Sequence, residues 1–264
     1  MVDLHTTFAG SIPEYYDRCL GPAQFDPFGR ELAALVPRDP GGDVLEIACG
    51  TGLVTRRLRD RLDPARRLVA SDLSKPMLDY ARASLAGIEG IEWREADAMK
   101  LPFEDREFAA VVCALGVMFV PDKIATFREM RRVLVDGGKL YFSVWDRLEE
   151  NSLAKVFAET IEAHFPGDAE VRFRLPWEMH DPVLLRRLLA DAGFDRVKID
   201  TKRLPITGVD ARTLATGQVR GTPRGALLEK RGMPMEKAIE LVTEAIGKID
   251  SAHGQALLIE ARAA

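Results

Sequence analysis

Several features that mark other kinds of protein are scarce in this chain. Its 264 residues include three cysteines, Cys19, Cys49 and Cys113, whose odd number and wide spacing give neither a disulfide framework nor a CxxC metal pair. It has 37 basic and 41 acidic residues, a net charge of −4, whereas a chain that grips nucleic acid carries a basic excess. We therefore expect no bound metal, no nucleic-acid partner and a reducing, cytoplasmic location.

Long hydrophobic runs are also absent. The longest uncharged apolar stretch, 108–121, has 14 residues, which is too short to span a bilayer. The amino terminus carries Asp3 and no basic residue before a hydrophobic block, so we expect no signal peptide. Internal repeats and low-complexity tracts are missing. With 47 % hydrophobic and 30 % charged residues, the composition indicates a folded core.

What the chain does contain is a regular alternation of short apolar runs with helical patterns. This alternation predicts an α/β fold, a doubly wound and mostly parallel sheet with helices on both faces and helical cap insertions. In such sheets ligands bind beyond the carboxyl ends of the strands. The seven expected strands are 44–47, 68–70, 91–95, 108–114, 140–145, 197–200 and 256–260.

Local signals set the expected ends of several helices. Ser74 is a candidate N-cap with Pro76 in the first turn, and Gly137-Gly138 is expected to end the preceding helix. Thr222-Pro223 is expected to open a helix, and a further helix is predicted over 235–249. These last two lie in the interval 205–254, which is too long for a plain connector and is expected to form a cap over a site.

The strongest chemical signal follows the first strand. The strand 44–47 leads into Ala48-Cys49-Gly50-Thr51-Gly52 and then a helix, and the glycines let a ligand approach the backbone closely. A dinucleotide loop has a third glycine where this chain has Thr55. Glu46, on the approach to the loop, disfavours a diphosphate and suits a ligand with an ammonium group.

Two more carboxylates stand at the ends of the next strands. Asp72 follows the second strand and is placed to accept hydrogen bonds from both hydroxyls of a ribose. Asp97 follows the third strand, where it is placed to bind an adenine amino group. The three acids and the glycine turn together predict a site for an adenosyl group joined to an amino acid.

As a set, residues 40–146 resemble the class I S-adenosylmethionine-dependent methyltransferases, of the small-molecule type known as type 11 or ubiquinone-biosynthesis-like. The resemblance rests on VLEIACGTG at 44–52, SDLS at 71–74, ADA at 96–98, the strand and loop 108–116, and 132–138. One departure is Ala48, where the family often has glycine, and we expect a slight local adjustment there. The fold implied is the Rossmann-like, seven-stranded methyltransferase fold.

The resemblance also implies a domain plan and a cofactor site. One methyltransferase domain would span 1–264, with a helical lid segment at 1–39, the cofactor-binding core at 40–146, and substrate-side insertions at 147–180 and 205–254. The cofactor would be S-adenosyl-L-methionine. The residues implied to bind it are Tyr16, Glu46, Ala48, Gly50, Gly52, Asp72, Leu73, Met77, Asp97, Ala98, Ala114 and Leu115.

The expected reaction is methyl transfer to O, C or N of a small, hydrophobic molecule. The sulfonium donor is already activated, so positioning suffices and the sequence defines no catalytic residue. Candidates on the acceptor side are Tyr15, Tyr16, His180 and, for an anionic substrate, Arg220. The apolar segment 113–119 replaces the Asn/Asp-Pro-Pro-aromatic motif of nucleic-acid amino-methyltransferases.

Two other functions stay open on sequence grounds. One is a nicotinamide-dependent oxidoreductase on the same architecture, against which the missing third glycine and Glu46 count. The other is a non-catalytic module that binds the cofactor or a partner. The sequence also leaves the acceptor and the oligomeric state open, a homodimer included.

Overall fold

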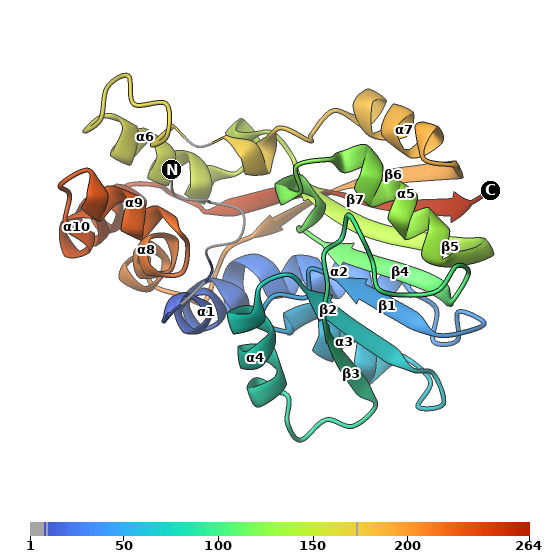
Figure 1. Cartoon of the computed structure of the whole chain (residues 1–264). Coiled ribbons are helices and arrows are strands. Elements are labelled where there is room, and N and C mark those ends of the chain that lie inside the picture. The colour runs from blue at the N-terminus through green and yellow to red at the C-terminus, as the bar shows by residue number, and fades with distance from the viewer. Residues whose placement is uncertain (1–7, 9, 173) are drawn as a thin grey trace.

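A seven-stranded β-sheet forms the centre of the computed structural model, which describes residues 8, 10–172 and 174–264 (Figure 1). The position of Asp3 and residue 173, which is part of the expected insertion 147–180, therefore lie outside the described residues. The strands are β1 Val44–Ile47, β2 Leu68–Asp72, β3 Ile91–Glu95, β4 Phe108–Ala114, β5 Leu134–Trp145, β6 Phe194–Pro205 and β7 His253–Ala263.

The strand order is β3-β2-β1-β4-β5-β7-β6. Strands β1 to β5 pair in parallel, and β7 runs antiparallel between β5 and β6. The predicted doubly wound, mostly parallel sheet is confirmed. The chain moves outward from β1 to β3 and then returns to place β4 on the other side of β1. This reversal leaves a crevice at the carboxyl ends of β1 and β4.

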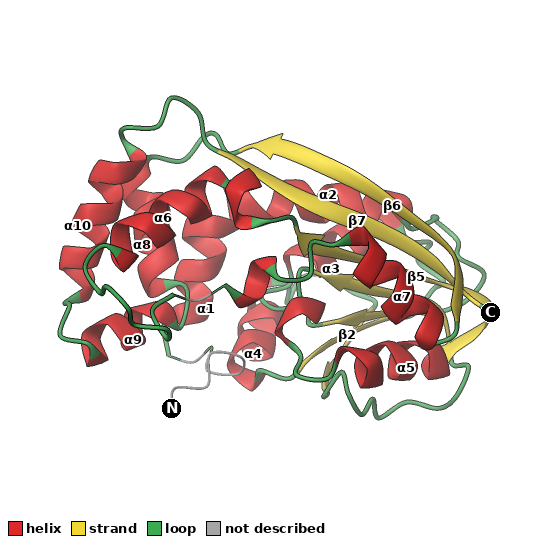
Figure 2. Ribbon diagram, turned by 90° about the horizontal axis from the view of Figure 1, so that it is seen from above, coloured by secondary structure: helices red, strands yellow, loops and turns green. Residues whose placement is uncertain are grey.

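Helices cover both faces of the sheet. They are α2 Asp26–Leu35, α3 Leu53–Arg61, α4 Lys75–Ser84, α5 Lys123–Val133 and α7 Pro182–Asp191. Figure 2 shows α5 and α7 on one face and α2 and α3 on the opposite face. The predicted cap of α4 is confirmed, because the Ser74 side chain accepts a hydrogen bond from the Met77 backbone N–H and Pro76 lies in the first turn.

Four further helices gather at one end of the sheet, and we call them the cap (Figures 1 and 2). They are α6 Ser152–Glu162, α8 Ala211–Arg220, α9 Arg224–Lys230 and α10 Met235–Ile246. Their apolar faces form a hydrophobic cluster of their own, which includes Phe157, Leu214, Val219, Ile239 and Val242. The main core, around the sheet, is a separate cluster.

The amino-terminal segment joins the sheet to the cap. It consists of α1 Ile12–Tyr15, then η1 Tyr16–Phe25, a π-helix, and then α2. Helix η1 packs closely on α8 because residue 217 is glycine, and a Cβ there would lie 2.6 Å from Cγ of Leu20. Short 3₁₀ turns lie at η2 Val117–Phe119, η3 Leu148–Glu150 and η4 Leu175–Trp177.

Three of the expected helix boundaries are wrong. Helix α5 ends at Val133, so Gly137-Gly138 lies inside β5, where the β4–β5 register shifts and Gly137 has φ +74°. Thr222 does not cap α9, because its hydroxyl donates to the Gln218 carbonyl at 2.7 Å and α9 begins at Arg224. The helix predicted over 235–249 ends at Ile246.

None of the helices within the described residues has the length and apolar character that a membrane crossing requires.

Candidate functional site

The loop between β1 and α3 owes its shape to left-handed backbone conformations. Ala48, Gly50 and Gly52 have φ of 54°, 56° and 85°. A residue with a Cβ takes this conformation at a cost of about 1–2 kcal/mol. The Ala48 methyl group fits because residue 116, in the loop after β4, is glycine: a Cβ there would lie only 2.5 Å from the Ala48 Cβ. The loops after β1 and β4 therefore meet in direct contact.

Two neighbouring cavities open at this loop, of about 360 Å³ and about 50 Å³. The larger lies between the strand ends, η1 and the cap, and its volume is in the range of small-molecule sites. Tyr16, Phe25, Ala48, Gly50, Ala114 and Leu115 line both cavities. The predicted cofactor residues that line the larger one are Tyr16, Ala48, Gly50, Asp72, Leu73, Met77, Asp97, Ala98, Ala114 and Leu115.

The Asp72 carboxylate is held at the end of β2 by backbone donors. One oxygen accepts from the Gly50 N–H at 2.8 Å and the other from the Ser74 N–H at 2.7 Å. Burial raises the pKa of Asp72, and these hydrogen bonds oppose the rise. Each carboxylate oxygen can accept more than one hydrogen bond, so the oriented group can still accept donors from a ligand in the larger cavity.

The wall beside Asp72 combines apolar side chains with a second carboxylate. Leu73 is 48 % exposed and lines the cavity together with Met77. An exposed apolar side chain of this kind suits contact with a flat apolar ring. Asp97 follows β3 and accepts from the Met99 N–H at 2.8 Å, which fixes its carboxylate next to Ala98. This wall offers apolar surface and a hydrogen-bond acceptor side by side.

Glu46 lines the smaller cavity and is almost fully buried, with 1 % exposure. Burial raises its pKa to about 8, the charge of Asp72 acts in the same direction, and the Thr55 hydroxyl opposes it. Its Oε2 atom has no hydrogen-bond partner among the described residues. A buried acceptor without a partner is rare in proteins, and it points to a donor group that a ligand would bring.

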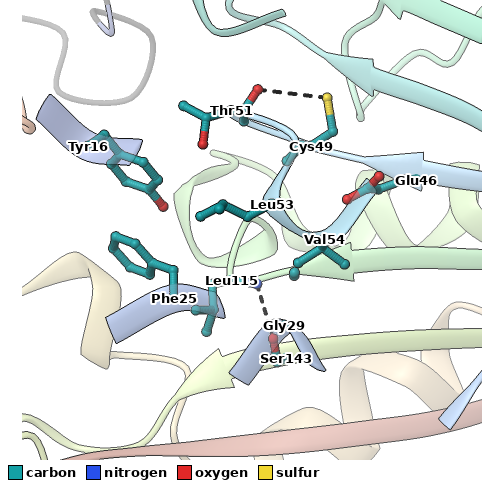
Figure 3. Close-up of a pocket in the computed structure, with 13 residues that line it drawn as sticks. Tyr16, Phe25, Gly29, Glu46, Cys49, Thr51, Leu53, Val54, Leu115 and Ser143 are labelled. Atoms are coloured by element: carbon teal, nitrogen blue, oxygen red, sulfur yellow. Dashed lines mark hydrogen bonds between the residues drawn. The ribbon is translucent and has the colours of Figure 1, made fainter. Parts of the chain in front are cut away.

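An aromatic pair forms the wall across from the loop. The rings of Tyr16 and Phe25 stack with centroids 4.4 Å apart and an angle of 10° between planes, and Phe8 meets Tyr16 edge-on. Figure 3 shows the two rings next to each other, with Leu53 between them and Cys49. Burial raises the pKa of Tyr16, so its hydroxyl stays protonated at neutral pH and can donate a hydrogen bond.

The structure places several of the predicted residues outside both cavities. Arg220 pairs with Glu236 at 2.7 Å and lies over the ring of Tyr15, and neither Arg220 nor Tyr15 lines a cavity. His180 also lies outside, with Nδ1 2.7 Å from the Trp177 carbonyl. These three sequence hypotheses for the acceptor side lose their geometric basis, and Tyr16 alone of the four candidates faces the site.

Gly52 is another predicted residue that lies outside both cavities, and its role toward the cofactor stays a prediction. It lines neither cavity and instead faces α4, because a Cβ at this position would lie 2.9 Å from Cδ1 of Leu85 and 3.2 Å from the Cβ of Ala81. Its glycine is required for the turn and for close packing of the loop on α4. Gly50, where a Cβ would meet no atom within 4 Å, is the glycine that lines the cavities.

Sequence reasoning missed the residues that the cap and η1 bring to the site. Gln218 donates to Gln24 at 3.1 Å across a separation of 194 residues, which no local pattern could reveal. Trp177 and Arg224 also line the larger cavity. Arg224 stands directly after Thr222-Pro223, so a correct start for α9 would have drawn attention to it.

Together these groups fit S-adenosylmethionine. Glu46 offers an unpartnered carboxylate oxygen toward the glycine loop, where an ammonium group would satisfy it. Asp72 offers an oriented carboxylate for the ribose hydroxyls, and Leu73, Met77 and Asp97 offer apolar contact and an acceptor for adenine.

Comparison with known proteins points the same way. A family profile described as a methyltransferase domain matches residues 44–138. The ubiquinone/menaquinone biosynthesis C-methyltransferase UbiE of Ectopseudomonas mendocina (strain ymp) is 36 % identical over 172 residues, which cover 60 % of this chain and 67 % of that protein. The chain thus spans about two thirds of the length of this relative.

Solved structures of low sequence identity share the fold. A SAM-dependent methyltransferase from Thermotoga maritima has a TM-score of 0.58 at 16 % identity, covering 95 % of each chain. Haemonchus contortus phosphoethanolamine N-methyltransferase 2, solved with phosphomonomethylethanolamine and S-adenosylhomocysteine, has a TM-score of 0.54 at 16 % identity. In that second comparison 96 % of this chain and 60 % of the other are covered.

Proposed function

The chain belongs to the class I S-adenosylmethionine-dependent methyltransferases of the ubiquinone-biosynthesis type, and from this premise we propose that its acceptor is a small molecule with an apolar body, bound beneath the cap. The observation that carries the proposal is the cavity of about 360 Å³, which is lined by Asp72 at the strand ends and also by Trp177 of η4 and Arg224 of the cap. The cavity therefore has room for ligand atoms on each side of the contact between the loops after β1 and β4.

The cofactor is assigned to the strand-end part of this cavity. Asp72 would accept from the ribose hydroxyls, and Leu73 and Met77 would flank the adenine. Asp97 and Ala98 would bind its edge. The remaining residues assigned to the amino-acid end are Glu46, the backbone of Ala48 and Gly50, and the surface formed by Ala114 and Leu115.

When bound, S-adenosylmethionine supplies a methyl group that is already activated for transfer, so the work left to the chain is positioning and the exclusion of water. Tyr16 and Phe25 cover the loop side, and Trp145 and Trp177 form apolar walls. Among the described residues that line the larger cavity there is no His, Lys, Cys or Glu. Asp72 and Asp97 are assigned to the cofactor, and burial raises the pKa of Tyr16, which keeps its hydroxyl protonated. We therefore assign no general base.

The two alternative functions find no support. The relative and the solved structures described above are methyltransferases, which favours methyl transfer over a nicotinamide-dependent oxidoreductase or a non-catalytic module. The position of the third dinucleotide glycine is held by Thr55, buried within α3. A cytoplasmic location is part of the proposal, supported by the free thiols of Cys19, Cys49 and Cys113.

Calorimetry with S-adenosylhomocysteine tests the cofactor assignment. We expect the wild type to bind, and Asp72→Ala to bind at least tenfold more weakly, about 1.4 kcal/mol, because the oriented ribose acceptor is lost. Asp79→Ala is the matched control, since Asp79 is exposed on α4 and pairs only with Lys75 among the contacts described. It should bind like the wild type.

Absence of heat at sub-millimolar concentration in the wild type would contradict the assignment. A fluorescence titration with NADH then shows whether the chain binds a nicotinamide cofactor, as the oxidoreductase alternative requires. Circular dichroism of both variants shows whether a loss of binding reflects the site or the fold.

A further inference from the structure

The cap contributes a cation to the larger cavity. Arg224 is the first residue of α9, and among the described residues that line this cavity it is the one with a positively charged side chain. The other charged lining residues, Asp72 and Asp97, belong to the part assigned to the cofactor. The polar side chains on the substrate side of the cavity are therefore the Gln24–Gln218 pair, the hydroxyls of Thr222 and Tyr16, and this guanidinium, which is the one charged group there among the described residues.

Aromatic rings hold the guanidinium in place. Its Cζ lies 4.9 Å from the centroid of the Phe157 ring and 5.4 Å from that of Trp177, and both rings are buried. Contact with ring faces attracts a cation and restricts its motion. The N–H donors of a guanidinium form a planar fork that matches the two oxygens of a carboxylate.

The electrostatic surroundings favour an anion at this position. Burial lowers the pKa of Arg224 to about 10, and the like charge of Arg174 acts in the same direction, whereas Glu162 opposes it. Glu162 in turn forms an ion pair with Arg174. The guanidinium is still charged at neutral pH, so it favours an anionic group over a neutral one in the cavity that it lines.

We propose that Arg224 binds a carboxylate of the methyl acceptor, so that the substrate class is a small apolar acid rather than a neutral hydrophobic molecule. This inference rests on the proposed function, because it assigns a role within the same cavity. A single guanidinium matches the two oxygens of a carboxylate, and the presence of Asp72 and Asp97 in the cavity disfavours a dianion such as phosphate.

The chain offers a matched control four residues earlier, at the end of α8. Arg220, which the sequence suggested as the anion-binding residue, lies outside the cavity and pairs with Glu236 at 2.7 Å. Arg220→Met removes one positive charge from the cap, as Arg224→Met does. It leaves the wall of the cavity intact.

The test uses pairs of probes that differ only in charge, 2-naphthoate with 2-naphthamide and 4-phenylbutyrate with its amide. Binding to enzyme saturated with S-adenosylhomocysteine is followed by calorimetry. In the wild type and in Arg220→Met, at least one acid should bind at least tenfold more tightly than its amide. In Arg224→Met that preference should vanish while the amide affinity stays within twofold. Arg224→Lys should retain part of the preference.

Failure of this inference can be told apart from failure of the proposed function. Each variant is first titrated with S-adenosylhomocysteine alone, and a wild type that does not bind it contradicts the proposed function. If the cofactor product binds but no acid binds more tightly than its amide, or if Arg224→Met keeps the preference, the carboxylate site is wrong and the methyltransferase assignment stands.

Discussion

Glu46 is the carboxyl group of the site whose pKa the fold brings close to neutral pH. In the folded chain its pKa is raised from 4.5 to about 8, chiefly by burial, so the carboxyl is mostly neutral at pH 7. A cofactor ammonium beside it would favour the ionised form and lower that pKa again. Binding would then release a proton at pH values between the lowered pKa of the loaded site and about 8.

The affinity for S-adenosylhomocysteine should consequently rise with pH between about pH 6 and about pH 7.5, by at most tenfold per pH unit. The sign follows because the empty site binds the proton more tightly than the loaded site does. Calorimetry in two buffers of different ionisation enthalpy measures the proton release directly. In Glu46→Gln both the release and the pH dependence should disappear, and an equal slope in the two proteins would show that Glu46 is not the linked group.

At the same scale, residues of one type that lie close together in the sequence have different positions relative to the cavity. Gly50 and Gly52 are both required by positive φ, yet only Gly50 faces the cavity. Arg220 and Arg224 are both cap arginines, yet only Arg224 lines it. A motif places a residue near the site, and contacts with other segments decide which way it faces.

At the scale of elements, the loops after β1 and β4 depend on one another. Ala48 keeps a methyl group in a left-handed conformation because Gly116 leaves room for it. The departure from the family's usual glycine at position 48 therefore has a structural counterpart at position 116, in the other loop of the same crevice.

Gly116→Ala should lower the free energy of unfolding by about 1–3 kcal/mol, because its Cβ would lie 2.5 Å from the Ala48 Cβ. In the double variant Ala48→Gly/Gly116→Ala that contact is gone, and part of the loss should be recovered. Recovery stays partial because Cys113 Sγ remains 3.1 Å from the new Cβ. Urea unfolding of the four proteins gives the coupling energy, and strictly additive effects would rule out the contact.

The π-helix η1 has a comparable role in shaping the site. Tyr16 and Phe25 are nine residues apart and stack in register. In an α-helix, with about 3.6 residues per turn, nine residues make about two and a half turns and the rings would lie on opposite faces. The wider turn of η1 brings them to one face, and no pattern in the sequence announces such a helix.

At the scale of the whole molecule, the sheet and the cap have separate hydrophobic cores with the ligand cavity between them. Elements with their own smaller core open at lower free energy than the central strands. A ligand that touches both sides stabilises the closed arrangement.

Hydrogen exchange should show this difference. In the free protein, amides of α8 and η1 should exchange faster than those of β1 and β4, and S-adenosylhomocysteine should slow exchange in η1 and α8. Helix α7, which packs on α5 and β6 away from the cavity, serves as the internal control and should not change. Protection confined to the β1 loop would mean that the cap does not respond to the cofactor.

The sequence alone determined the parallel sheet, the glycine loop and the acids at the strand ends. These rest on local signals: buried apolar runs such as β4, a cap such as Ser74, and a turn that only glycine tolerates. Because the carboxyl ends of parallel strands meet at one edge, Asp72 and Asp97 could be placed together before any contact was known.

Only the tertiary structure decided how the other half of the cavity is built. The stack of Tyr16 on Phe25, the Gln24–Gln218 hydrogen bond and the placement of Arg224 between Phe157 and Trp177 join segments far apart in the chain. Their positions follow from how the cap packs on η1 and the sheet. That packing depends on the summed fit of many side chains, which no local pattern of residues records.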